Sequence, residues 1–198
     1  IIAVRRTKDA RAMIYVAVAE TPEDNAVYLR LEQFGVDAQL VRGSDLSLAD
    51  KTAGSGVDAW EYYPQLLFVR PYAVASGDGI PTLCTKMLTR DEATLKVDST
   101  ECLVEGVENL QVEFGIDTSV PPDYAADFYT ATPTADQLEQ AVNARIYVLA
   151  RTVNEVTGYL NDKTYNLGAT TVAAANDGYY RRMLQTTVVL RNGELYGF

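Results

Sequence analysis

The chain has 198 residues, of which 47% are hydrophobic, and this is enough to bury the core of a single domain. Its 27 acidic and 17 basic residues give a formal net charge of −10, so long-range electrostatics repel phosphate backbones and argue against nucleic-acid binding. The chain contains no histidine, which excludes Ser-His-Asp and Cys-His nucleophile systems as well as HExxH zinc sites.

Cofactor and membrane signals are also missing from the sequence. Two cysteines without histidine cannot build a standard four-ligand zinc site, and no GxxxxGK[ST] or GxGxxG motif offers a phosphate cradle, so we expect no cofactor of these kinds. No window approaches the roughly 20 apolar residues that a membrane-spanning helix needs, and no signal-peptide pattern is present. The chain begins at Ile1-Ile2 without methionine, which is typical of a processed or expressed fragment, so we expect an upstream segment.

The first 40 residues contain two predicted elements. Residues 13–19 suit either the end of an alanine-rich helix or a strand, while residues 26–32 alternate as a strand does. Tyr, Val and Thr are abundant along the whole chain in short runs that Gly, Pro, Asn and Asp separate. This texture predicts a β-rich protein.

Further strands are predicted over residues 65–74, 82–88 and 183–192, with turns at residues 77–79 and 192–193. Residues 101–116 form another strand candidate, in which apolar side chains at positions 110, 112, 114 and 116 alternate with Asn109, Gln111, Glu113 and Gly115. This alternation predicts one buried and one wet face. We expect antiparallel pairing throughout.

Residues 133–153 change their periodicity partway along. Thr134 is a plausible helix N-cap, and Leu138, Ala141 and Val142 follow at helical spacing. Residues 145–149 then become β-branched and aromatic, as a strand does. We therefore predict a short helix that leads directly into a strand.

Residues 117–127 form an acidic loop that could gather oxygen ligands around calcium. Asp117, Asp123 and Asp127 are the candidate ligands, because calcium prefers carboxylate and carbonyl oxygens. The loop lacks the EF-hand spacing and its glycine. Pro121 and Pro122 favour the alternative, an ordered surface turn with solvated aspartates.

Carboxylates are the remaining candidates for catalysis. Glu105, Glu108 and Glu113 lie on one extended segment, and a glycosidase needs only two suitably separated acids. Acidic strands are common, however, so we do not expect an enzyme.

Tyrosine and arginine doublets have two interpretations each. The tyrosine pairs at residues 62–63 and 179–180 could form a stacking platform for sugars or a partner surface, although alternation within strands explains them more simply. Arg181-Arg182 could contact an acidic neighbour in an assembly, but a solvated basic pair is the favoured interpretation.

Cys84 and Cys102 lie 18 positions apart in segments that we interpret as neighbouring strands. This separation suits one disulfide across an antiparallel pair, which would contribute about 3 kcal/mol by closing the loop. Two reduced cysteines in a cytosolic core fit the composition equally well.

Several phrases together resemble the PilW family of type IV pilus minor pilins, relatives of the type II secretion pseudopilins. The resemblance spans residues 57–192, and the phrase at residues 103–117 is the most specific part of it. The other matching phrases, which follow the family's order, are residues 79–83, 142–151, 163–168 and 177–182. Many relatives have a Gly- and Asp-rich loop after the long strand, whereas Val120-Pro121-Pro122 interrupts it here, which weighs against metal binding.

The resemblance implies an α+β fold: a pilin-like, antiparallel β-sheet-rich globular domain with short helices, whose N-terminal membrane helix is truncated. We expect one domain over residues 1–198, in which residues 1–56 precede the PilW-like region at residues 57–192. The resemblance also favours the Cys84–Cys102 disulfide over free thiols.

The implied function is structural. The full-length subunit would join other minor pilins in a tip complex that primes pilus assembly, with the major pilin and a tip adhesin as further partners. Adhesion and twitching motility would then depend on it indirectly. It would be anchored in the inner membrane with a periplasmic globular domain, and would become extracellular at the pilus tip. The alternatives are a type II secretion pseudopilin of the J kind and a secreted carbohydrate-binding β-domain.

Overall fold

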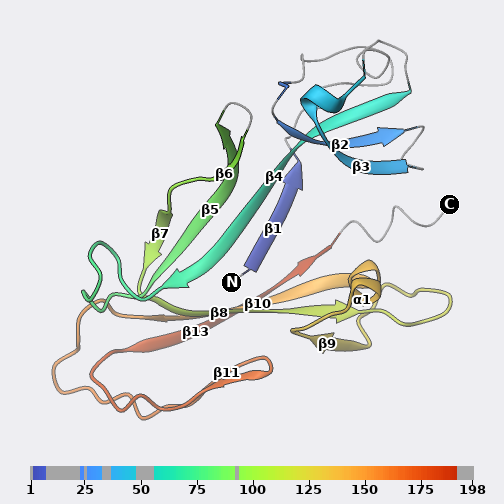
Figure 1. Ribbon diagram of the computed structural model, residues 1–198. Coiled ribbons are helices and arrows are strands. Elements are labelled where there is room, and N and C mark those ends of the chain that lie inside the picture. Colours follow the sequence, from blue (N-terminus) through green and yellow to red (C-terminus); the bar gives the residue numbers. More distant parts are fainter. Residues whose placement is uncertain are drawn as a thin grey trace. The chain divides into compact units, whose positions relative to one another are not determined.

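The computed structural model describes residues 2–7, 23–24, 26–32, 37–47, 56–91 and 94–190, and Figure 1 shows that strands dominate them. The strands of the first half are β1 (Ile2–Thr7), β2 (Val27–Glu32), β3 (Asp37–Arg42), β4 (Val57–Arg70), β5 (Thr82–Asp91) and β6 (Thr94–Val97). Those of the second half are β7 (Glu101–Glu105), β8 (Val107–Ile116), β9 (Phe128–Thr130), β10 (Ala141–Arg151), β11 (Tyr165–Leu167), β12 (Thr170–Val172) and β13 (Arg181–Val189).

The prediction of an α+β, pilin-like fold with short helices is wrong. The described residues contain a single α-helix, α1 (Ala135–Glu139), and a 3-10 turn, η2 (Gly43–Asp45); the rest of the regular structure is antiparallel β-sheet. The helical spacing after Thr134 yields little more than one turn, because the β-branched and aromatic residues that follow it form β10. No helix in the described part of the chain is long and apolar enough to cross a membrane.

The chain divides into two compact units whose segments alternate along the sequence. Unit 1 comprises residues 1–67 and 85–101, and unit 2 comprises residues 68–84 and 102–198. The expected organisation as one domain over residues 1–198 stays a prediction.

Unit 1 contains β1, β2, β3 and β6 with most of β4 and β5, all of which belong to the larger sheet. The strand order of this sheet is β3-β2-β4-β5-β6, with β1 also paired to β4 and β7 to β5. A small core lies against β2 and β4, where Tyr28 packs with four buried residues: Ala26, Leu46, Val57 and Ala59. The Tyr28 hydroxyl accepts a 2.9 Å hydrogen bond from the Glu23 backbone N–H, so the ring is buried without losing its polar partner.

Unit 2 contains a four-stranded sheet in the order β13-β10-β8-β9 and a separate hairpin of β11 and β12. The hairpin packs on one face of the sheet, where Leu167 contacts Tyr147 and Leu149 of β10. All pairs of strands whose register is described are antiparallel, as predicted. Figure 1 shows the sheet as a long, twisted layer with the hairpin beside it.

Most of the predicted strands are present, with different limits. Residues 26–32 contain β2, and residues 82–88 lie within β5. The strand predicted at residues 65–74 is the second half of β4, which begins at Val57 and ends at Arg70. The strand predicted at residues 183–192 is β13, and its last two residues lie outside the described part, as do residues 13–19.

Candidate functional site

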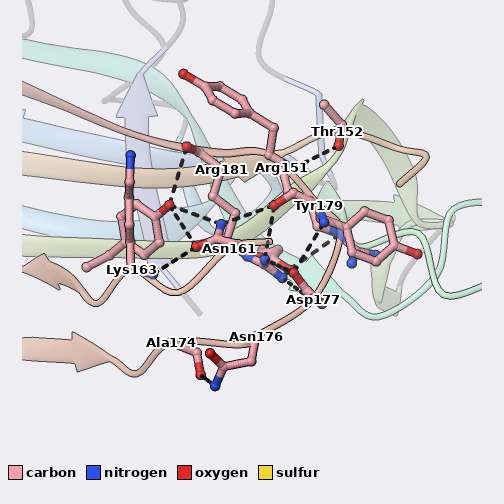
Figure 2. A network of polar contacts seen from close by, with 12 residues as sticks. Arg151, Thr152, Asn161, Lys163, Ala174, Asn176, Asp177, Tyr179 and Arg181 are labelled. Carbon is pink, nitrogen blue, oxygen red and sulfur yellow. Dashed lines mark hydrogen bonds and ion pairs between the residues drawn. The ribbon is translucent and has the colours of Figure 1, made fainter. Parts of the chain in front are cut away.

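Arg181, the first residue of β13, is the centre of a polar cluster at one end of the unit 2 sheet (Figure 2). The residue is only 8% exposed, and its side chain lies between two carboxylates. Nε and Nη2 donate to the two oxygens of Glu108 at 2.6 and 2.9 Å, and Nη1 and Nη2 donate to those of Asp177. Arginine suits this position because its planar donors serve two carboxylates at once.

Arg151, the last residue of β10, joins the same cluster. Its Nε lies 3.4 Å from Glu108 Oε1, and its guanidinium stacks on the Tyr179 ring at 3.7 Å from the centroid. Its Nη2 donates to the backbone carbonyl of Gly79. The cluster therefore links the ends of β8, β10 and β13 with the loop before β5.

The electrostatics of the cluster are balanced, since two guanidinium groups face two carboxylates. The hydrogen bond from Arg181 lowers the pKa of Asp177, although burial opposes that effect. Asp177 and then Glu108 raise the pKa of Arg181 above its already high value. The formal charges of the two guanidinium groups and the two carboxylates sum to zero within the cluster.

Asn161 extends the cluster into the long connection between β10 and β13. The residue is fully buried; its Nδ2 donates to the Tyr179 carbonyl and to the Tyr165 hydroxyl, both at 3.1 Å. Its backbone N–H donates to the Asp177 carbonyl, which closes the connection on itself. Because buried polar groups are costly unless paired, these bonds fix the path of the connection.

The favoured interpretation of Arg181-Arg182 as a solvated pair is therefore wrong for Arg181. The acidic partners expected in a neighbouring molecule lie within this chain, at Glu108 and Asp177. The four-residue spacing of Asp177 and Arg181 indicated in the sequence that these two side chains could pair. Glu108 is distant in sequence, and the pairing of β8, β10 and β13 brings it near Arg181. The cluster is an internal polar contact that holds the ends of these strands together, and its formal charges sum to zero.

Glu113 forms a second internal anchor, on the face of β8 that the hairpin covers. The residue is 7% exposed, and its carboxylate accepts from the Tyr147 hydroxyl at 2.9 Å and from the Ala169 N–H at 2.8 Å. Burial, followed by the hydrogen bond to Glu113, raises the pKa of Tyr147. The predicted wet face of residues 101–116 is thus wrong at Glu113 and at Gly115, which are both buried, and a turn at Gly106 divides that segment into β7 and β8.

The acidic loop, residues 117–127, uses its aspartates as acceptors for its own backbone. Asp117 accepts from the N–H groups of Ser119 and Tyr124 at 2.9 and 2.7 Å, and the bond from Ser119 contributes most to lowering its pKa. Asp127 accepts from Thr118 N and Oγ1, and Asp123 accepts from Ala125 N.

In the described part of the chain, no three His, Cys, Asp or Glu side chains are grouped to hold a metal. The structure gives Asp117, Asp123 and Asp127 separate hydrogen-bond partners, and calcium at these residues stays a sequence-based prediction. The loop presents two exposed apolar side chains, Val120 (97% exposed) and Tyr124 (59%).

A second loop, residues 71–81, is organised by a single carboxylate that the sequence analysis missed. Asp78 accepts hydrogen bonds from the N–H groups of Ala73, Val74, Ala75 and Ile80 at 2.9–3.1 Å. These bonds, led by that of Ile80, lower the pKa of Asp78 to about 2. The glycines on both sides of Asp78 were the available signal, since both adopt positive φ in the turn.

Cys84 and Cys102 are joined by a disulfide in the structure. Cys84 ends the first segment of unit 2 and Cys102 begins the second, so the bond connects the points at which the chain leaves and re-enters that unit. The 17 residues between them, 85–101, belong to unit 1. The disulfide therefore joins the two residues that flank the segment belonging to unit 1.

These features define a disulfide-bonded β-sheet protein whose charged clusters maintain its own loops and strand ends. The sequence model of a protein family described as Type IV pilus-assembly protein W matches residues 71–192, which is more than half of the chain. The chain therefore belongs to this family, and the predicted PilW resemblance is confirmed. The match begins 14 residues later than the predicted 57–192 and ends at the same residue. No curated protein and no solved structure matches the chain.

Proposed function

We propose that the chain is the globular part of a type IV pilus minor pilin that joins other minor pilins in a tip complex and primes pilus assembly. The observation that carries this proposal is the family match over residues 71–192. The matched region contains the disulfide, both anchored loops and the whole sheet of unit 2. It is the part of the chain on which a family role in pilus assembly would depend.

The structure supports a docking role for the acidic loop, residues 117–127. Asp117 holds this loop by accepting backbone hydrogen bonds from Ser119 and Tyr124. Loops fixed before binding lose less conformational entropy when they meet a partner. The exposed Val120 and Tyr124 at the acidic loop are suited to contact a neighbouring subunit.

The proposed location follows the same assignment. The subunit would be anchored in the inner membrane by a helix upstream of this chain, with the globular part in the periplasm before assembly and at the extracellular pilus tip afterwards. The Cys84–Cys102 disulfide supports this location, because disulfides persist in the bacterial periplasm and on cell surfaces. Major pilin and a tip adhesin are the further proposed partners.

The carbohydrate-binding alternative has less support. A shallow hollow beside the disulfide is lined by the residues Ala73, Thr82, Cys102, Leu103, Val104 and Glu105. It contains no aromatic ring on which a sugar could stack. Of the Tyr179-Tyr180 pair, Tyr179 is covered by Arg151 and Tyr180 packs against Tyr159, with 5.6 Å between the ring centroids.

The proposal is tested by a pull-down of the 198-residue chain against the other minor pilins of its source, with type II pseudopilins as the comparison set. Selective capture of minor pilins is the expected result, and deletion of the gene should reduce the number of surface pili. Preference for pseudopilins would assign the protein to secretion instead. Capture of neither set, together with normal piliation, would overturn the proposal.

A matched pair of variants localises the contact. Val120→Asp changes the exposed tip of the acidic loop, and Val74→Asp makes the same change at another exposed loop position (87% exposed). If the acidic loop docks a minor pilin, Val120→Asp should reduce capture about tenfold, whereas Val74→Asp should leave it unchanged. Equal capture by both variants would remove the acidic loop from the docking surface.

A further inference from the structure

The two edges of the unit 2 sheet differ strongly. At one edge, β9 has only three residues, so it offers little backbone for another strand to pair with. At the other edge, β13 has nine residues. These residues, 181–189, pair with residues 143–151 of β10 in one unbroken register. In the described part of the chain no strand lies beyond β13.

The hydrogen-bond pattern shows which backbone groups of β13 point outward. At its two ends, Thr152 N donates to Tyr180 O and Leu190 N donates to Val142 O. Antiparallel ladders alternate, so the even-numbered residues of β13 bond to β10. The odd-numbered residues Met183, Gln185, Thr187 and Val189 therefore direct their N–H and C=O groups away from it.

This edge has none of the usual protection against pairing. From Met183 to Leu190 the sequence has no charge, no proline and no glycine, and it is rich in β-branched residues. Every side chain from Arg182 to Val189 is exposed, including both Leu184 and Val188, so the strand is accessible on both faces. A long, regular and uncharged edge of this kind is a template for another strand.

Residues 183–189 of β13 have side chains of symmetric character about Thr186. In an antiparallel pair of two β13 strands centred there, Met183 of one copy faces Val189 of the other, and Leu184 faces Val188. Gln185 then faces Thr187, and Thr186 faces itself. Within residues 183–189, apolar residues face apolar ones, polar residues face polar ones, and no charged residues are opposed; next to this segment, Arg182 faces Leu190. This register also matches outward-pointing odd residues with each other, as an antiparallel ladder requires.

We propose that β13 is a self-association edge on which a second copy of this chain pairs antiparallel about Thr186. The two unit 2 sheets then form one continuous sheet with a two-fold axis. Such an interface uses the same surface on both copies and closes on itself, so it yields a dimer. The short β9 edge ends the joined sheet on both sides and prevents growth into a fibre.

The inference is independent of the proposed pilus role and is tested on the purified 198-residue chain. Sedimentation velocity over a concentration series should show a monomer–dimer equilibrium. Val189→Asp, at a side chain that is 72% exposed, should weaken the dimer about tenfold, because it faces Met183 twice in the symmetric pair. Val74→Asp is the control and should leave the dimer unchanged. Circular dichroism melts identify any variant that fails to fold.

Cysteine cross-linking tests the register. Two Thr186 residues in a non-hydrogen-bonded pair have Cα atoms about 4.5 Å apart, within disulfide range, so Thr186→Cys should form a covalent dimer on oxidation. Gln185→Cys is the matched control: its counterpart lies diagonally, about 7 to 8 Å away, and should cross-link poorly. The native cysteines are paired with each other and do not interfere.

Three outcomes would overturn the inference. The first is a wild-type chain that stays monomeric at all concentrations. The second is a dimer that Val189→Asp does not weaken, which would place the contact elsewhere. The third is cross-linking of Gln185→Cys in preference to Thr186→Cys. If the chain stays monomeric but Val189→Asp abolishes capture of another pilus subunit, the edge binds that subunit and the second-copy proposal is wrong.

Discussion

At the scale of single residues, Arg181 depends on two carboxylates because its guanidinium is almost fully removed from water. We predict that Glu108→Ala destabilises the folded protein by about 3 kcal/mol, since it leaves a buried cation with Asp177 alone and removes the ion pair to Arg151. Urea denaturation measures this loss as a lower midpoint at unchanged slope.

The control for this prediction is Glu139→Ala, which removes an exposed glutamate at the end of α1. It should change stability by no more than about 0.5 kcal/mol. A Glu108→Ala protein as stable as the control would mean that the cluster contributes little net free energy, as some buried ion pairs do.

Asp78 makes the loop at residues 71–81 sensitive to acid. Its pKa in the folded protein is about 2, below the ordinary value of 3.8, so the contribution of its hydrogen bonds is fully present above pH 3.8 and is lost as the pH falls through about 2. The amide resonances of Val74 and Ile80 should therefore titrate with a midpoint near 2 in an NMR pH series.

Asp78→Asn provides the comparison for this titration. The variant keeps one oxygen acceptor but has no proton to gain, so the low-pH shift of the two amide resonances should disappear. A midpoint near 3.8 in the wild-type protein would show that the four N–H donors do not stabilise the carboxylate.

At the scale of elements, the hairpin of β11 and β12 contacts β8 closely, with Gly168 of the hairpin against Glu113. Gly168 has φ of +63°, and a Cβ there would lie 2.3 Å from Glu113 Oε1. We predict that Gly168→Ala destabilises the protein by about 3 kcal/mol, because it combines an unfavourable backbone conformation with a clash against the anchor. Thermal unfolding measures the loss.

Gly158→Ala separates the two causes. Gly158 also has positive φ, at +76°, but a Cβ there would contact nothing within 4 Å. This variant should cost only the backbone strain, about 1 kcal/mol. Equal losses for the two variants would show that the contact with Glu113 is unimportant.

Local sequence patterns predicted the helices and strands better than they predicted which side chains are buried. Thr134 caps α1 in a capping box with Gln137, and the helix leads into β10, as the spacing of the residues indicated. The burial of Glu113 could not be predicted in the same way, since its partners lie 34 and 56 residues away, at Tyr147 and Ala169. Alternation describes which face of a strand a residue occupies, but not which element later covers that face.

The same distinction explains the error in fold class. The resemblance to pilins led to an expectation of short helices, whereas the chain's own β-branched and aromatic content favoured strands throughout. Similarly, Arg181 was assigned to solvent because Glu108, its partner 73 residues away, is brought near it only by the sheet. Sequence reasoning failed where long-range pairing determines the environment of a charge.

At the scale of the whole molecule, the net charge of −10 opposes any contact between two copies of the chain. The β13 edge is uncharged from Met183 to Leu190, so the attraction proposed there is apolar and backbone-mediated, while the repulsion is electrostatic and long-range. Salt screens only the repulsion: the Debye length falls from about 30 Å at 0.01 M to about 10 Å at 0.1 M.

We therefore predict that the dimer tightens by about threefold when the ionic strength rises from about 0.01 to 0.1 M. Sedimentation velocity at matched protein concentrations measures the shift, and Val189→Asp should retain the same direction with weaker association throughout. A dimer that dissociates as salt is added would have to be held by ion pairs. Since residues 183–190 contain no charged side chain, that result would place the contact away from this segment and would contradict the proposed edge pairing.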